Sequence, residues 1–116
     1  MKALVWLADS RSRVRAFPGP VQDDVGFALY LAQLGNKSAK AKPLHGLGFG
    51  GVMEIAANGS SATYRAVYAV SIGDSIYVIH AFQKKSKTGI ATPQAEIDIV
   101  RERLKQLRSE VNKNAK

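Results

Sequence analysis

The sequence predicts a small α+β domain in which two N-terminal helices and a C-terminal helix pack on a small, mainly antiparallel sheet. Apolar residues recur at helical spacing near both ends of the chain. In the middle they alternate with period two, and tight-turn signals separate the alternating segments. The 116 residues suit a single domain over residues 1–116. We therefore expect the order strand, helix, helix, strand, strand, strand, helix.

The N-terminal elements are a buried strand and two short helices. Residues 3–7 form an apolar run long enough for one strand. A helix over residues 10–16 ends at a Pro-Gly-Pro turn, because proline cannot donate a hydrogen bond inside a helix. Pro20 suits the first position of a second helix, which ends at Gly35. The apolar residues of this helix are Val21, Val25, Ala28, Leu29 and Ala32.

An antiparallel meander is expected in the second half. Residues 36–51 are rich in Lys and Gly without clear periodicity and are interpreted as a connection. Strands are expected over residues 52–56, 63–72 and 75–82. Alternation divides the middle strand into two faces, one with Tyr64, Ala66, Tyr68 and Val70, the other with Arg65, Val67 and Ala69.

The last element is an amphipathic helix. Thr92 is its expected N-cap and Pro93 its first residue. Residues 112–116 are expected to fray. The helix presents a narrow apolar stripe of Ile97, Val100, Leu104, Leu107 and Val111.

Composition excludes several classes of protein. No run of eighteen apolar residues is present, and the N-terminal apolar run is too short for a signal peptide, so we expect a soluble cytoplasmic protein. The absence of cysteine excludes disulfides, thiolate nucleophiles and Cys-based zinc sites. Two isolated histidines, His45 and His80, do not suggest a metal site.

The net charge of +8 favours polyanionic partners, which include nucleic acid, the ribosome and acidic proteins. Any one basic cluster is typical of a solvated face, but three with few compensating acids favour an electropositive surface. The clusters are Arg11/Arg13/Arg15, Lys37/Lys40/Lys42 and Lys84/Lys85/Lys87.

Arg65 is the most unusual of the candidate functional residues, because a charged side chain stands in the middle of an apolar strand. It either lies on the solvent face and pairs with a carboxylate such as Glu54, or belongs to a phosphate-binding surface. Lys84 and Lys85 follow the last strand, where functional groups are often displayed, although edge lysines also prevent aggregation. His80 is more typical of a satisfied strand residue than of an acid or base.

Several short motifs, in this order and spacing, resemble the RelE/ParE toxin superfamily and, more narrowly, its phage-derived HigB-like group. They include YRAVY at 64–68, IHAFQKK at 79–85, and the Thr-Pro pair at 92–93 before an amphipathic helix. AKPLHGL at 41–47, followed by VMEI at 52–55, matches the loop into the first meander strand. The resemblance covers nearly the whole chain and implies a RelE-like fold.

The resemblance implies the toxin of a type II toxin–antitoxin system, most often a ribosome-dependent endoribonuclease. In such an enzyme a ribose 2′-OH attacks the adjacent phosphate. The motifs assign phosphate clamping to Arg65, charge stabilisation to Lys84 and Lys85, and an auxiliary acid–base role to His80. RNA contacts are expected from Lys40, Lys42 and Lys87.

The general base is the least determined of these roles. Some RelE-type enzymes have lysines in the first meander strand, whereas this chain has Val-Met-Glu-Ile at 52–55. Glu54 is a candidate base only if its side chain shares a sheet face with Arg65.

The resemblance also implies partners: a helix-turn-helix, HigA-like antitoxin, the ribosome and mRNA, with DNA contacted only through the antitoxin complex. No metal or organic cofactor is required, because side-chain cations can stabilise the charged phosphate. Two alternatives stay open. One is a gyrase-poisoning toxin on the same fold, and the other is a non-catalytic nucleic-acid-binding module.

Overall fold

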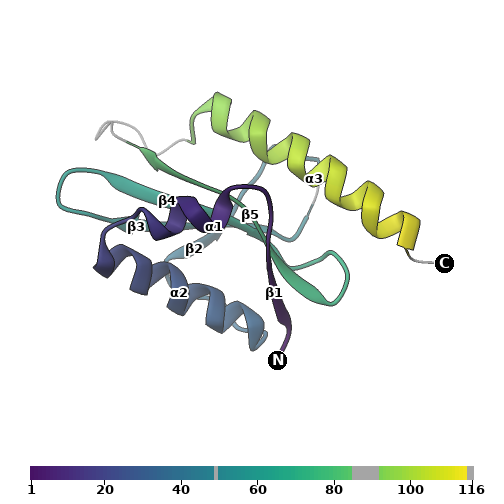
Figure 1. Cartoon of the computed structure of the whole chain (residues 1–116), viewed down its shortest axis with the longest axis horizontal. Coiled ribbons are helices and arrows are strands. Elements are labelled where there is room, and N and C mark those ends of the chain that lie inside the picture. Colours follow the sequence, from purple (N-terminus) through teal and green to yellow (C-terminus); the bar gives the residue numbers. More distant parts are fainter. Residues whose placement is uncertain (49, 85–91, 115–116) are drawn as a thin grey trace.

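Three layers make up the structure, a computed structural model that describes residues 1–48, 50–84 and 92–114. A five-stranded sheet lies in the middle, with α1 (Ser10–Arg15) and α2 (Gly19–Gln33) on one face and α3 (Gln94–Asn114) on the other (Figure 1). The α+β class and the three predicted helices are confirmed. Of the described helices, none has the length and apolar content needed to cross a membrane.

The sheet has the strand order β1-β5-β4-β3-β2. Its first strand, β1 (Ala3–Trp6), runs parallel to β5, and every other pair is antiparallel, which confirms the mainly antiparallel prediction. The remaining strands are β2 (Ala41–Pro43), β3 (Val52–Asn58), β4 (Thr63–Ala69) and β5 (Ser75–Lys84).

The short strand β2 corrects the prediction, which treated residues 36–51 as a connection. Residues Ala41–Pro43 pair with β3, and backbone bonds from Ala56 to Lys40 and from Leu44 to Val52 extend the pairing on both sides. Three residues are too few to produce a visible period of two. Among the residues that the structure describes, four strands rather than three therefore lie between α2 and α3.

The start of α3 also differs from the prediction. The carbonyl of Pro93 accepts the first helical hydrogen bonds, from the amides of Glu96 and Ile97. Pro93 therefore occupies the capping position, and the hydroxyl of Thr92 bonds to a side chain of the sheet instead.

Two apolar cores fill the spaces between the layers. The first core joins α1 and α2 to residues such as Ile55, Ala66 and Tyr68. The second joins the sheet to α3 through the predicted stripe, in which Val100 and Leu104 are fully buried. The predicted faces of β4 are confirmed, because Tyr64, Ala66 and Tyr68 pack in the first core while Val67 and Ala69 pack in the second.

A β-bulge in β5 changes which residues face α3. Val67 pairs with His80, but the next residue, Tyr68, pairs with Val78, so Ile79 is an extra residue in β5. Ile79 packs in the second core, and His80 bonds to side chains of α3. The bulge thus places two consecutive side chains toward α3, which strict alternation does not allow.

Candidate functional site

Four charged residues, one from each of four neighbouring strands, lie on the face of the sheet that α3 covers. Lys42 of β2 lies opposite Glu54 of β3, and opposite residues in paired strands project to the same face. The partner of Arg65 in β3 is Ala56, two residues from Glu54. Its partner in β5 is Phe82, two residues from Lys84. We call Lys42, Glu54, Arg65 and Lys84 the charged row.

Arg65 and Glu54 form the centre of the charged row as a largely buried ion pair. Arg65 Nη1 lies 2.9 Å from Glu54 Oε1, and the Thr92 hydroxyl donates to Glu54 Oε2 at 2.7 Å. Only 8% of Arg65 is exposed. The predicted pairing with Glu54 is therefore present, although Arg65 is buried rather than on a solvent face. A buried ion pair contributes little net stability, so stability alone does not explain why this pair lies in the sheet.

Glu54 meets the condition set for a general base, because its side chain shares a face with Arg65. A carboxylate can accept the proton of a hydroxyl, while a neighbouring guanidinium stabilises negative charge on a phosphate. The charged row places one such acceptor between cationic residues of the adjacent strands. This arrangement suits acid–base and electrostatic work on a phosphodiester.

Lys84 is buried at the end of β5, in the charged row. Lys85 and Lys87, the other lysines predicted to act with it, lie outside the described residues.

The predicted cluster of Lys37, Lys40 and Lys42 does not form one surface. Lys40 Nζ lies 2.8 Å from Asp24 of α2, which packs on the opposite face of the sheet from the charged row. Lys37 Nζ donates to the carbonyls of Ser38 and Ala41. Of these three lysines only Lys42 joins the charged row, whereas Lys40 pairs with Asp24 of α2.

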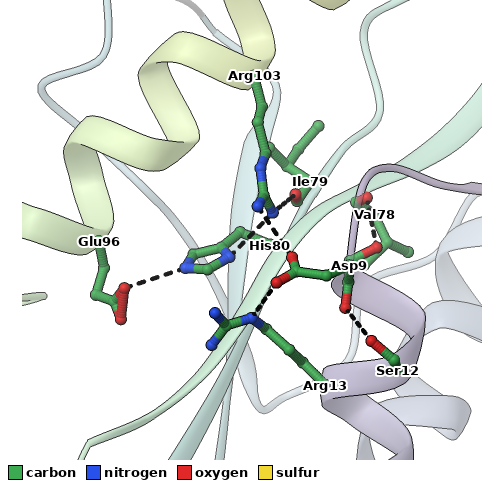
Figure 2. Close-up of polar contacts among 9 residues, drawn as sticks. Asp9, Ser12, Arg13, Val78, Ile79, His80, Glu96 and Arg103 are labelled. Carbon is green, nitrogen blue, oxygen red and sulfur yellow. Dashed lines mark hydrogen bonds and ion pairs between the residues drawn. The ribbon is translucent and has the colours of Figure 1, made fainter.

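His80 lies beneath α3 and has no exposed surface. Its Nε2 is 3.1 Å from Glu96 Oε1, and its Nδ1 is 3.2 Å from Arg103 Nη1 (Figure 2). A guanidinium only donates, so Nδ1 accepts and the proton resides on Nε2, which donates to Glu96. Burial lowers the pKa of His80, against the opposing effect of Glu96. This geometry favours the satisfied strand residue over an acid or base in contact with RNA.

Arg103 connects His80 to the start of α1. Its Nη1 also donates to the Ile79 carbonyl at 3.0 Å, and its Nη2 donates to Asp9 Oδ1 at 2.9 Å (Figure 2). Arg13 donates to the other oxygen of Asp9 at 2.7 Å. The hydrogen bond from Arg13, with help from Arg103, lowers the pKa of Asp9. This network ties α3 to β5 and α1, and thereby holds α3 over the sheet.

No pattern in the sequence predicts that Asp9, Thr92, Glu96 and Arg103 belong to these networks. Asp9 and Arg103 are 94 positions apart, and no local pattern relates them. Glu96 and Arg103 lie among the many charged residues of the last helix, and such a pattern is equally typical of a solvent-exposed face. Among the described residues, no group of three His, Asp or Glu side chains gathers as metal ligands would.

The buried His80 makes stability depend on pH. Its folded pKa lies below the ordinary value of 6.5, so below pH 6.5 the unfolded chain binds a proton that the folded protein does not. We expect the free energy of unfolding to fall as the pH decreases from 7.5 to 5.5, by at most about 1.4 kcal/mol per pH unit for one proton. Urea denaturation at several pH values measures this slope. The slope should flatten in His80→Gln, and an equal slope in that variant would contradict the assignment.

The comparisons with known proteins add a family match. The model of the family described as "Phage derived protein Gp49-like (DUF891)" matches residues 12–105. The matched range contains the whole charged row and His80. No curated protein matches the chain.

Proposed function

Because the chain belongs to the phage-derived Gp49-like family, a RelE/HigB-type family of toxins in toxin–antitoxin systems, we propose that it is a ribosome-dependent endoribonuclease. It cuts mRNA and thereby arrests translation, and its fold is RelE-like. The observation that supports this activity best is the charged row, in which Glu54 and Arg65 meet on one face of the sheet. The net charge of +8 favours binding to the ribosome and mRNA.

The reaction is an internal transfer within the RNA. Glu54 accepts the proton of a ribose 2′-OH, and the 2′ oxygen forms a bond to the adjacent phosphorus. The bond from phosphorus to the 5′ oxygen of the next nucleotide breaks, and that oxygen takes a proton from solvent. The products are a 2′,3′-cyclic phosphate and a 5′-hydroxyl.

The cations of the charged row stabilise the transition state. Arg65 offers two N–H groups to the phosphate oxygens, and Lys84 adds a second positive charge as the phosphorane forms. Lys42, at the exposed end of the charged row, contacts the RNA backbone. We propose the same kinds of contribution for Lys85 and Lys87. His80 acts as a positioning residue, which holds β5 and α3 together.

The toxin family implies an antitoxin partner. We propose that this antitoxin is a HigA-like, helix-turn-helix protein. In that arrangement the toxin contacts DNA only through the antitoxin complex.

Inducible expression in a bacterium tests the proposed activity. We expect growth arrest, with new 5′ ends of mRNA inside translated codons that disappear when translation initiation is blocked. A Glu54→Gln variant expressed at the same level should produce neither effect. Growth arrest with intact mRNA would contradict cleavage and favour a gyrase target. Normal growth would favour a nucleic-acid-binding module.

A further inference from the structure

The outer face of α2 carries three large apolar side chains that no other described element covers. Phe27 is 60% exposed, and Tyr30 and Leu34 are each 46% exposed. Their spacing of three and four residues places them along one side of the helix. We call Phe27, Tyr30 and Leu34 the α2 ridge. In Figure 1 α2 lies at the border of the molecule, on the far side of the sheet from α3.

The helical segment that contains the α2 ridge is apolar on every side except at Gln33. Its inner face packs in the first core through Val25, Ala28, Leu29 and Ala32. From residue 25 to residue 36 the sequence has no charged residue, although 22% of the whole chain is charged. A helix that is apolar all round is typically buried, and contiguous exposed apolar side chains mark interaction sites. The outer face of α2 therefore has the composition of an interface.

A cavity of about 340 Å³ lies at the C-terminal end of α2, between this end and the sheet. Ala32, Gly35 and Asn36, which flank Leu34 in the chain, form one side of it. Met53, Tyr68 and Val70 of the sheet region form the apolar side, and Lys2 and Lys37 also line it. The cavity therefore offers apolar contact beside positive charge, and Leu34 of the α2 ridge is the neighbour in sequence of Gly35 in its lining.

We propose that the antitoxin docks on the α2 ridge, as an amphipathic segment that places one apolar side chain in the cavity and acidic residues beside Lys2. This inference rests on the toxin function proposed above. Charge decides between the possible occupants. Two copies of this chain would bring together two domains of net charge +8, whereas an acidic partner is attracted. Aromatic side chains such as Phe27 and Tyr30 are typical anchors of protein interfaces.

The position of the α2 ridge separates binding from catalysis. α2 packs on one face of the sheet and the charged row lies on the other. Substitutions in the α2 ridge should therefore weaken antitoxin binding while toxicity persists. The antitoxin would neutralise the toxin by keeping it out of the ribosome rather than by covering the charged row.

The test uses Phe27→Asp and, independently, Tyr30→Asp in the full chain. The matched control is Ser109→Asp, which adds the same charge on an exposed part of α3. The probe is the purified product of the reading frame next to this gene, titrated calorimetrically with each variant. We expect at least tenfold weaker binding for both ridge variants and unchanged binding for the control. Both ridge variants should still arrest growth, and co-expression of the probe should no longer restore growth.

Three outcomes would overturn the inference. The first is that both ridge variants bind the probe with wild-type affinity and have the circular dichroism spectrum of the native protein. The second is that the wild-type chain does not bind the probe. The third is that the free chain is a dimer and becomes a monomer when Phe27 is replaced. The last result would assign the α2 ridge to a second copy. The proposed activity is judged separately, since a non-toxic wild-type chain whose ridge variants lose the probe would refute the nuclease and leave the docking site intact.

Discussion

Glu54→Gln is expected to lower the rate of mRNA cleavage by about 100- to 10,000-fold, the usual contribution of a general base. The amide keeps the size of the side chain, and its oxygen still accepts from Arg65 Nη1, which lies 2.9 Å from the carboxylate in the native protein. The Thr92 hydroxyl can turn to accept from the new NH₂ group. The fold should therefore persist while the proton acceptor is lost, although the free energy of unfolding should fall because the buried Arg65 loses its anion.

The measurement is the rate of mRNA cleavage on purified ribosomes, with the thermal unfolding midpoint recorded for each variant. Asp98→Asn is the matched control, because it makes the same carboxylate-to-amide change at an exposed position of α3. A Glu54→Gln protein that cleaves at the native rate would show that Glu54 serves structure alone. The base would then have to be sought elsewhere.

Removal of Arg65 alone is expected to destabilise the protein by about 3–5 kcal/mol, because it leaves the buried Glu54 without its cation. Arg65→Ala is therefore not a clean test of activity. The double variant Glu54→Gln/Arg65→Met should recover most of that loss, since it removes both charges and keeps much of the volume. It should still be inactive.

Urea denaturation of Glu54→Gln, Arg65→Met and the double variant Glu54→Gln/Arg65→Met gives the coupling energy of the pair. If the double variant recovers stability but not cleavage, the structural role of Arg65, which is to pair with Glu54, is separate from its role in the reaction. Two outcomes would contradict these roles of Arg65. Additive losses of stability would mean that the pair is not coupled, and a double variant that cleaves mRNA at the native rate would mean that neither charge is needed for cleavage.

Periodicity predicted the helices and the two faces of β4, because each pattern is local and each buried face is apolar over several turns or residues. Alternation also placed Arg65 with Val67 and Ala69, on the face that α3 covers. It could not show whether that face is buried at residue 65, because burial there depends on segments distant in the chain.

The remaining features depend on contacts between distant segments. β2 is a strand only because Ala41 pairs with Ile55, and His80 faces α3 only because of the bulge at Ile79. The bonds of Arg103 to Asp9 and His80 join three elements without any sequence signal. The sequence therefore predicted which residues of the candidate site share a face of the sheet. It did not predict the side chains that they contact.

We propose that the charged row cleaves mRNA bound to the ribosome. The most direct test incubates the purified protein with ribosomes that carry a defined mRNA, with free mRNA in parallel, and determines the ends of any products. We expect cleavage only on ribosomes, with 2′,3′-cyclic phosphate and 5′-hydroxyl ends, and no cleavage by Glu54→Gln. Intact mRNA in a ribosome complex that binds the native protein would contradict it.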